Sequence, residues 1–311
     1  MVTLDEIRAA REVLASVAVR TPLLPLKSGG REGIYLKCEN LQRTGAFKIR
    51  GAFHKISRLP PGCPGVTASS SGNHAQGVAL AASLRGLKAV IVMLDQSAPH
   101  KLAATRALGA EVILGGRTSV ALKERAEREA AERGFVYVPP FNDPEVIAGQ
   151  GTVGLEILED LPEIRSVVVP VGGGGLLSGI GTAVKESRPD VRVFGVEPEG
   201  APKMTLSLER GTIVTIPEPQ TVADGLKPSR IGELTFEHAR RYVDAMALVS
   251  DNEILSAARH LLVREKLVVE PSGAAALAAI LSGKLPLPEG PTVAVLSGGN
   301  ADIRRILDFT A

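Results

Sequence analysis

The chain has 311 residues, a length typical of about two domains. Its 36 Lys and Arg residues against 34 Asp and Glu residues give a net charge of +2, and only 3% of residues are aromatic. We therefore expect neither a basic surface for nucleic acid or an anionic membrane nor a stacking platform for single strands. The two cysteines, Cys38 and Cys63, predict free thiols in a reducing compartment, the cytoplasm. No apolar run reaches the ~18 residues of a transmembrane helix.

Short β-branched apolar runs alternate along the chain with stretches of helical periodicity, the pattern of an open α/β sheet. The first helix begins at a capping box formed by Thr3 and Glu6. Most of the apolar runs are continuous, which is typical of parallel strands buried on both faces. The predicted strands are Ile34–Cys38, Val66–Ser69, Ala89–Met93, Glu111–Leu114, Phe135–Val138, Ser166–Val171, Arg192–Val196, Ala247–Val249 and Thr292–Leu296. The predicted later helices are Val120–Arg133, Pro144–Asp160, Asn252–Glu265 and Gly273–Leu281.

Two clusters rich in proline interrupt this pattern, at residues 60–65 and 139–144. Proline and glycine clusters of this kind break both helices and strands. We therefore expect the chain to hinge, or to cross between domains, at these two places.

A segment around Lys48 is the first that carries chemistry. In CENLQRTGAFKIRGAF, residues 38–53, Thr44 is expected to cap a helix that begins near Gly45 or Ala46. Lys48 then lies in the first turn, where the positive end of the helix favours its neutral amine. A neutral amine is what Schiff-base chemistry requires. The ordinary alternative is a solvated lysine.

Two further turns follow strands and lie where open α/β sheets bind ligands. In TASSSGNHAQGVALAA, residues 67–82, Ser70–Asn73 form a polar turn before a helix that begins near His74. The amides of such a turn can bind a carboxylate. Ser297, followed by two glycines, ends the last predicted strand. An ordinary capped turn explains either segment equally well.

The clearest signal is a run of four glycines, Gly172–Gly175, between the strand Val167–Val171 and a helix that begins near Leu176. Successive amides of such a loop, together with the helix dipole, form a phosphate cradle. No lysine follows as in a Walker A loop, and Leu177 breaks the dinucleotide fingerprint. Glu197, at the end of the next strand, nevertheless occupies the position of a ribose-binding acid. A nicotinamide-dependent oxidoreductase therefore stays open at this point.

Six segments occur in this order between residues 38 and 302, within a resemblance that runs from about residue 5 to 308: CENLQRTGAFKIRGA, SSSGNHAQGVA, VPVGGGGLLSG, VADGLKPSRIG, EPSGAAALAA and LSGGNAD. With these segments the sequence resembles the threonine dehydratase/serine racemase group of pyridoxal-phosphate enzymes, of fold type II in the tryptophan synthase β-like superfamily. The resemblance implies two open, mostly parallel α/β sheet domains with pyridoxal 5′-phosphate in the cleft between them. Residues 1–55 and 142–311 would form the large domain, and residues 56–141 the small one.

The resemblance also implies a role for each matching residue. Lys48 is expected to hold the cofactor as a Schiff base and to act as the base, with Ser71 as a second catalytic group. The other expected cofactor contacts are Phe47, Asn73 at the phenolic oxygen, Gly172, Gly173, Gly174, Gly175 and Leu176 at the phosphate, Gly225, and Ser297 at the pyridine nitrogen. The substrate carboxylate is expected at Ser70, Ser71, Gly72, Asn73 and His74.

The implied reaction is β-elimination of L-threonine, and of L-serine, to 2-oxobutanoate or pyruvate plus ammonia. Serine racemase is the nearest alternative, and a non-enzymatic binding protein is opposed by the presence of Lys48. The implied partners are a small hydroxy amino acid and further copies of the chain, in a homodimer or homotetramer. Some relatives bind a divalent cation near a Glu-Pro-x-x-Ala-x-Asp segment, but here Lys203 replaces its last acid. We expect no metal site, and an ammonium paired with Glu197 in its place.

Overall fold

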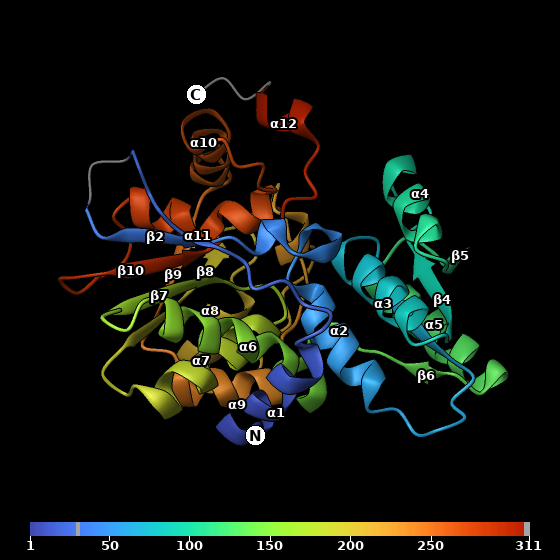
Figure 1. The fold of residues 1–311 in the computed structure, drawn as a ribbon. Helices are drawn as coiled ribbons and strands as arrows, with labels where there is room; N and C mark the ends of the chain where they lie inside the picture. The colour runs from blue at the N-terminus through green and yellow to red at the C-terminus, as the bar shows by residue number, and fades with distance from the viewer. Residues whose placement is uncertain (29–31, 308–311) are drawn as a thin grey trace.

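Two sheets organise the chain in the computed structural model, which describes residues 1–28 and 32–307. The larger sheet has the strand order β1-β2-β10-β7-β8-β9 and the smaller the order β5-β4-β3-β6. All neighbouring strands are parallel except β1, which is antiparallel to β2. Figure 1 shows the smaller sheet and its helices on the right, with α2 between the two sheets. The predicted fold class, α/β with two mostly parallel sheets, is confirmed.

The strands of the larger sheet, in spatial order, are β1 (Leu23–Pro25), β2 (Ile34–Lys37), β10 (Thr292–Val295), β7 (Ser166–Pro170), β8 (Arg192–Pro198) and β9 (Ala245–Val249). Those of the smaller sheet are β5 (Glu111–Leu114), β4 (Lys88–Met93), β3 (Gly65–Ser69) and β6 (Val136–Tyr137). The helices are α1 (Leu4–Leu14), α2 (Lys48–Ser57), α3 (Asn73–Leu84), α4 (Pro99–Ala107), α5 (Ser119–Arg133), α6 (Pro144–Asp160), α7 (Gly175–Ser187), α8 (Lys203–Arg210), α9 (Glu233–Tyr242), α10 (Asp251–His260), α11 (Pro271–Leu281) and α12 (Ile303–Leu307).

All nine predicted strands are present, with ends that differ by at most two residues. The edge strand β1 was not predicted, because three residues carry no periodicity. The helix predicted over 252–265 is α10 followed by a π-helical turn at Leu261–Glu265. Each sheet draws its strands from only one of the two predicted domains, but the boundaries at 55/56 and 141/142 stay a prediction.

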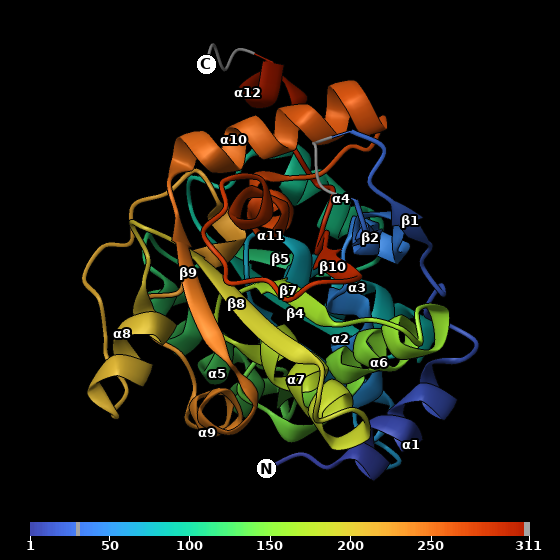
Figure 2. The same ribbon diagram turned by 90° about the vertical axis from the view of Figure 1, so that its left-hand side faces the viewer.

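The larger sheet is buried on both faces, as its continuous apolar runs predict. On β7, Val167 and Val169 pack with residues of α6, α7 and α9, while Val168 between them packs with α10 and α11. Figure 2 shows these helices above and below the sheet. Each fully buried valine contributes roughly 1.5 kcal/mol or more of apolar burial. The carboxyl ends of the parallel strands are therefore held in fixed relative positions.

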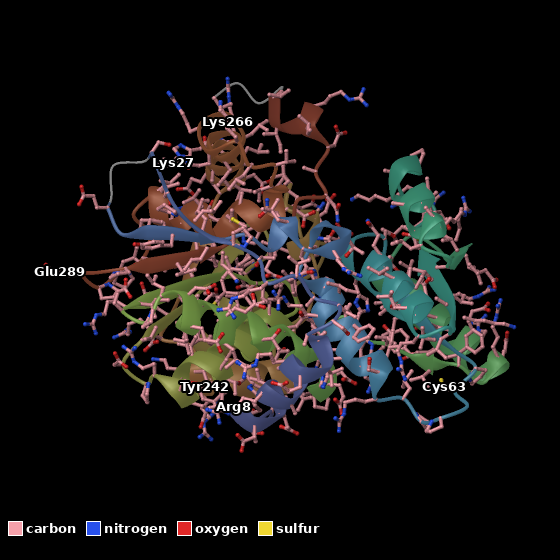
Figure 3. All side chains as sticks on the ribbon, viewed as in Figure 1. Arg8, Lys27, Cys63, Tyr242, Lys266 and Glu289 are labelled. Atoms are coloured by element: carbon pink, nitrogen blue, oxygen red, sulfur yellow. The ribbon has the colours of Figure 1, made fainter. Side chains whose placement is uncertain are left out.

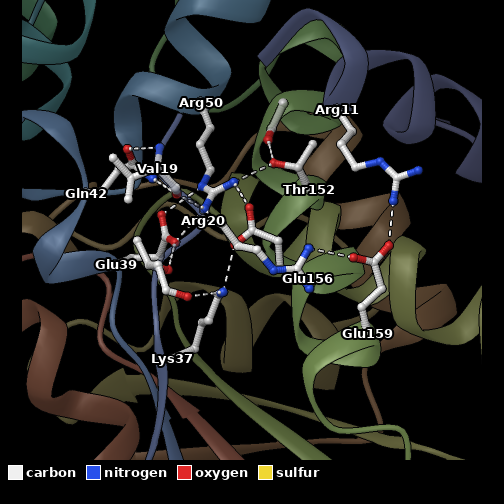
Figure 4. A network of polar contacts seen from close by, with 12 residues as sticks. Arg11, Val19, Arg20, Lys37, Glu39, Gln42, Arg50, Thr152, Glu156 and Glu159 are labelled. Carbon is white, nitrogen blue, oxygen red and sulfur yellow. Dashed lines mark hydrogen bonds and ion pairs between the residues drawn. The ribbon is translucent and has the colours of Figure 1, made fainter. Parts of the chain in front are cut away.

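Helix α2 links the two halves of the molecule. Its Ile49, Ala52 and Ile56 are buried in one apolar cluster with residues of β3, β4 and α3. Its Arg50, only 1% exposed, instead donates hydrogen bonds to Glu39 and Glu156, which belong to the larger half (Figure 4). The helix that begins at Lys48 is thus fixed by apolar contacts on one side and by ionic contacts on the other.

The amino-terminal capping box and the free thiols are both as predicted. Thr3 Oγ1 accepts a hydrogen bond from the Glu6 amide, and the Glu6 carboxylate accepts one from the Thr3 amide. Cys38 is buried after β2, and Cys63 lies on the loop between α2 and β3 (Figure 3), so the two thiols are unpaired. Within the described residues, no helix combines the length and apolarity that a membrane span requires.

Candidate active site

Lys48 is the first residue of α2, and the chain enters this helix from an extended segment. Ala46 has φ −163° and ψ 156° and forms a β-bridge with Gly298. The Phe47 amide then donates to the Ser297 carbonyl oxygen at 3.2 Å. The start of α2 is thereby fixed to the carboxyl end of β10, which brings together two of the predicted segments.

The predicted helix cap at Thr44 is wrong. Thr44 lies in a 3₁₀ turn with φ 60°, and its Oγ1 is buried without a hydrogen-bond partner among the described residues. The bridge between Ala46 and Gly298 keeps the chain extended past the predicted start, so the helix begins only at Lys48. Lys48 nevertheless lies in the first turn, as predicted.

The Lys48 amine lies in a largely desolvated position. Its Nζ donates to the Pro140 carbonyl oxygen at 2.6 Å and lies 5.0 Å from the centre of the Phe47 ring. Burial lowers the pKa of Lys48 to about 8. A substantial share of the amine is therefore neutral near physiological pH, which suits a nucleophile or a base.

His74 lies close to this amine but is held as a neutral ring. Burial, and then the charge of Lys48, lower the pKa of His74 to about 3. A neutral imidazole next to a carbonyl oxygen must donate to it, so His74 donates its Nε2–H to the Val138 carbonyl oxygen at 2.9 Å. The side chain is thus engaged in fixing α3 to the chain just after β6, which leaves the backbone amide of His74 for the predicted contact with the substrate carboxylate.

The serine turn lies between β3 and α3, with Gly72 as the residue before the helix. Ser71 Oγ accepts hydrogen bonds from the Leu94 amide at 2.7 Å and from the Ser97 hydroxyl at 2.9 Å. With its lone pairs engaged, the Ser71 hydroxyl proton is directed elsewhere. The first amides of a helix have no carbonyl partner in that helix. The amides of Ser70 and Gly72 are already engaged, by the Val92 carbonyl oxygen and by Ser70 Oγ. Among the described residues the turn therefore presents the Ser71 hydroxyl proton and the amides of residues 71, 73 and 74, which suit a carboxylate.

Asn73 is held at the start of α3 by two side chains from distant segments. Its Oδ1 accepts from Asn300 Nδ2 at 2.8 Å, and its Nδ2 donates to Glu270 Oε1 at 2.6 Å. An amide nitrogen carries two hydrogens, so one remains for a ligand. A Cβ added at Gly298 would lie 2.7 Å from Glu270 Oε1 and 2.9 Å from Asn73 Nδ2, so these groups meet at one point.

Glu270 is the acidic residue of this site that the sequence reasoning missed. Burial raises its pKa to about 7, and the hydrogen bond from Asn73 opposes the rise. The residue sits in the motif EPSGAAALAA, which was quoted for the resemblance without a role for its acid. A carboxyl group that titrates near neutrality, beside a predicted cofactor ligand, is typical of an active site.

The four-glycine loop joins β7 to α7. Other segments lie so close to its backbone that a side chain would not fit. A Cβ at Gly172 would lie 2.7 Å from the Gly225 carbonyl oxygen, and one at Gly173 would overlap the Phe141 ring. Gly174 has φ +96°, a conformation that other residues rarely adopt. In the described part of the chain, no hydrogen bond engages the amides of residues 172–176 as donors. The loop therefore offers a set of free amides at a helix amino-terminus, which fits a phosphate group.

Gly225 and Ser297 complete the set of predicted residues. The Gly225 amide donates to Ser272 Oγ at 2.8 Å, and the Gly225 carbonyl borders the glycine loop. Ser297 is 5% exposed, and no hydrogen bond joins its hydroxyl to a described residue. A hydroxyl without a protein partner can donate to or accept from a ligand, so Ser297 has capacity for one. The residues present thus fit pyridoxal phosphate: free amides for its phosphate, a partly neutral lysine for its aldehyde and polar side chains for its ring.

The Glu197 carboxylate is not placed to bind a ribose. Its position after the strand was the reason to keep a nicotinamide-dependent oxidoreductase as an alternative. The carboxylate is fully buried and accepts hydrogen bonds from the amides of Met204 and Thr205 at the start of α8. It also pairs with Lys203 Nζ at 3.1 Å, as expected from the sequence. An acid with all its oxygens engaged cannot bind a ribose. No cluster of three or more His, Cys, Asp or Glu residues that would suit a metal ion occurs among the described residues.

Comparisons with known proteins identify the family to which the chain belongs. The family model described as "Pyridoxal-phosphate dependent enzyme" matches residues 15–298. The chain is 48% identical over 313 residues to the L-threonine ammonia-lyase of Thermotoga maritima, a match that covers 98% of this chain and 77% of that protein. The solved structure of a threonine deaminase from T.th. is 44% identical with a TM-score of 0.92, and the match covers 99% of this chain and 100% of that one. Maize serine racemase is 37% identical with a TM-score of 0.94, and the match covers 99% and 96%.

The chain therefore belongs to the family of pyridoxal-phosphate dependent enzymes. The predicted cofactor class and the resemblance to the threonine dehydratase/serine racemase group are confirmed, and the nicotinamide alternative is excluded.

Proposed function

We propose that this protein is an L-threonine ammonia-lyase that also accepts L-serine. The observation that carries the proposal is the Lys48 amine, desolvated to a pKa of about 8 at the start of a helix fixed to the carboxyl end of β10. The full-length similarity to an enzyme named for this activity, at 48% identity, supports the choice of substrate. The products expected are 2-oxobutanoate from threonine and pyruvate from serine, each with ammonia.

The residues that would hold the cofactor are those that the geometry leaves with free donors. The amides of Gly172–Gly175 and Leu176 suit the phosphate, and Phe47 borders the Lys48 amine. The second hydrogen of Asn73 Nδ2 suits the phenolic oxygen, and the Ser297 hydroxyl suits the ring nitrogen. When bound, pyridoxal phosphate supplies a conjugated ring that accepts the electron pair left on the substrate Cα.

Lys48 would then move the proton. In its neutral form Nζ accepts the hydrogen from the substrate Cα, and the pKa of about 8 keeps it near the ambient pH at which general bases work best. The substrate β-hydroxyl takes up a proton, which balances the one removed from Cα, and leaves as water. Another water then hydrolyses the released enamine to the oxo acid and ammonia. Because the Ser297 hydroxyl is neutral, it does not stabilise a positive ring nitrogen as a carboxylate would, which favours prompt loss of the hydroxyl group.

The serine turn would orient the substrate. The amides of residues 71, 73 and 74 and the Ser71 hydroxyl proton suit the two carboxylate oxygens. Ser71 itself is held by Leu94 and Ser97 from the loop after β4, so its hydroxyl has a defined direction. This fixed direction would also allow Ser71 to exchange a proton with the substrate.

The test is to incubate the purified protein separately with L-threonine and L-serine and to quantify 2-oxobutanoate, pyruvate and D-serine. The proposal predicts oxo acid from both substrates and little D-serine. A protein that yields D-serine as its main product from L-serine would instead be a serine racemase, as the similarity to the maize enzyme allows. The Lys48→Ala variant is the control, because any oxo acid that it still forms would come from a contaminating protein. A homodimer or homotetramer in the cytoplasm stays a prediction, and sedimentation would measure the assembly.

A further inference from the structure

Lys203, the first residue of α8, has a side chain that is 0% exposed and surrounded by oxygen atoms. Its Nζ lies 3.1 Å from Glu197 Oε1 and donates to the carbonyl oxygens of Val171, Ala201 and Leu226 at 3.1, 3.1 and 3.0 Å. We call these four oxygens the oxygen cage. A carboxylate with several backbone carbonyls is the donor set that hard cations take in proteins. Here the cation is an ammonium carried by the chain.

The acid of the oxygen cage is fixed independently of the Lys203 side chain. Glu197 Oε1 accepts from the Met204 amide at 2.9 Å, and Oε2 accepts from the Thr205 amide and hydroxyl, both at 2.8 Å. Burial lowers the pKa of Lys203, and the Glu197 charge opposes that effect. The ammonium has three N–H donors for the three carbonyls, whereas a neutral amine has only two. The cage therefore suits the charged form.

The other oxygens of the cage come from segments that border the candidate cofactor site. Val171 directly precedes the glycine loop, and Leu226 directly follows Gly225. Gly172 approaches the Gly225 carbonyl so closely that a Cβ would lie 2.7 Å from it. Lys203 Nζ thus donates hydrogen bonds to both of these segments, which also approach each other closely at Gly172 and Gly225.

We propose that Lys203 is a tethered cation, a positioning residue that fixes the glycine loop against residues 223–226 and so sets the affinity for the cofactor phosphate. The inference rests on the phosphate role proposed for the glycine loop. It also means that the protein needs no dissociable metal ion at this position. Removing the ammonium while adding a carboxylate converts the oxygen cage into a site for a free cation.

The experiment compares the wild type with Lys203→Met and Lys203→Asp, each with calcium or after exhaustive chelation. Lys227→Met is the matched control, because Lys227 is a nearby lysine that is 41% exposed and pairs with the exposed Asp224. The measured quantity is the dissociation constant of pyridoxal phosphate, followed by its absorbance, with the thermal midpoint of each cofactor-free protein as a second readout. Threonine turnover is recorded separately, at saturating cofactor.

We expect wild type and Lys227→Met to bind the cofactor equally with and without calcium. Lys203→Met should bind about tenfold more weakly in both conditions, the effect of losing one charged hydrogen-bonding group. Lys203→Asp should be equally weak after chelation and should recover with calcium in both affinity and thermal midpoint. This calcium dependence is a response that a merely structural lysine would not give.

Three results would each overturn the inference: a wild type that loses cofactor on chelation, a Lys203→Met protein with wild-type affinity, or a Lys203→Asp protein indifferent to calcium. If Lys203→Met does not fold, the comparison of wild type with Lys203→Asp, each with calcium and after chelation, still tests the inference. Failure of the proposed function would appear differently, as a wild type that binds pyridoxal phosphate but releases no oxo acid from threonine.

Discussion

Replacing Arg50 by methionine tests whether the ionic network behind α2 anchors the helix that carries Lys48. The Arg50 guanidinium donates to Glu39 through Nε and Nη2, both at 2.8 Å, and to Glu156 at 2.7 and 2.9 Å (Figure 4). Arg50 is 1% exposed and Glu39 is 0% exposed. Methionine fills much of the same space but leaves Glu39 without the partner that compensates its burial.

Removing one partner of a buried ion pair destabilises a protein by about 3–5 kcal/mol. Glu156 retains Lys37 Nζ at 2.7 Å, and Glu39 retains the Thr21 hydroxyl at 2.6 Å, so we expect the lower end, about 3 kcal/mol. The control is Arg58→Met, just beyond the end of α2. Arg58 is 54% exposed and pairs with Glu145 at 2.9 Å, so its loss should cost under ~1 kcal/mol.

The pH dependence adds a second, independent signature. Burial raises the pKa of Glu39, but the charge and hydrogen bonds of Arg50 outweigh it, so the pKa lies below the ordinary 4.5. In the wild type, the stability that this lowered pKa contributes is complete above pH 4.5. It is lost as the pH falls through the lowered pKa. Without Arg50, burial dominates and raises the folded pKa above 4.5, so that the variant gains stability as pH falls towards that value.

The stability gap between wild type and Arg50→Met should therefore be smaller at about pH 5 than at about pH 8. Urea unfolding of the cofactor-free proteins, followed by circular dichroism, measures it. A loss below ~1 kcal/mol at the higher pH, or a loss equal to that of Arg58→Met, would refute the anchoring role. A gap that widens in acid would show that Glu39 is not the group left unpaired.

Four further outcomes follow from the site. Lys48→Ala should abolish oxo acid formation while the circular dichroism spectrum is retained, and borohydride should fix the cofactor of the wild type to a peptide that contains Lys48; a label on another lysine would contradict the assignment. Gly173→Ala should weaken pyridoxal phosphate binding at least about tenfold, because its Cβ would overlap the Phe141 ring; cofactor titration checks this. Ser297→Asp should slow elimination and produce long-wavelength absorbance after threonine is added; an unchanged spectrum and rate would remove Ser297 from the cofactor site. Glu270 has a raised pKa, so its folded form holds a proton between the ordinary 4.5 and about 7, and stability falls as pH rises through this window. Glu270→Gln should lose that fall, which urea midpoints across the window would measure.

Much of the fold was predictable from the sequence because parallel strands buried on both faces read as continuous apolar runs. The run Ser166–Pro170 is buried at every position, and the alternating helical segments then require crossovers. The glycine loop was equally predictable, since Gly174 adopts a positive φ and Gly173 abuts an aromatic ring. Only glycine meets these backbone requirements, so the loop can be recognised from the sequence.

The start of α2 was not predictable by the same reasoning. Thr44 has the residue type and spacing of a cap, but a long-range contact between Ala46 and Gly298 keeps the chain extended past it. Local propensity is a weak signal, and tertiary pairing overrides it here. Glu270 was missed for a related reason, because its partner Asn73 lies on a different element and nothing in either segment alone indicates the pair.

The oxygen cage shows the limit of sequence reasoning most clearly. The pairing of Lys203 with Glu197 was expected because the resemblance implies a segment that ends in an acid in some relatives, where this chain has Lys203. The three carbonyl oxygens were not, because every residue has a carbonyl and only the fold decides which ones converge. Substitutions of Val171, Ala201 or Leu226 leave those oxygens in place as long as the backbone is unchanged. Among the residues that form the cage, its charge balance therefore depends on the side chains of Glu197 and Lys203.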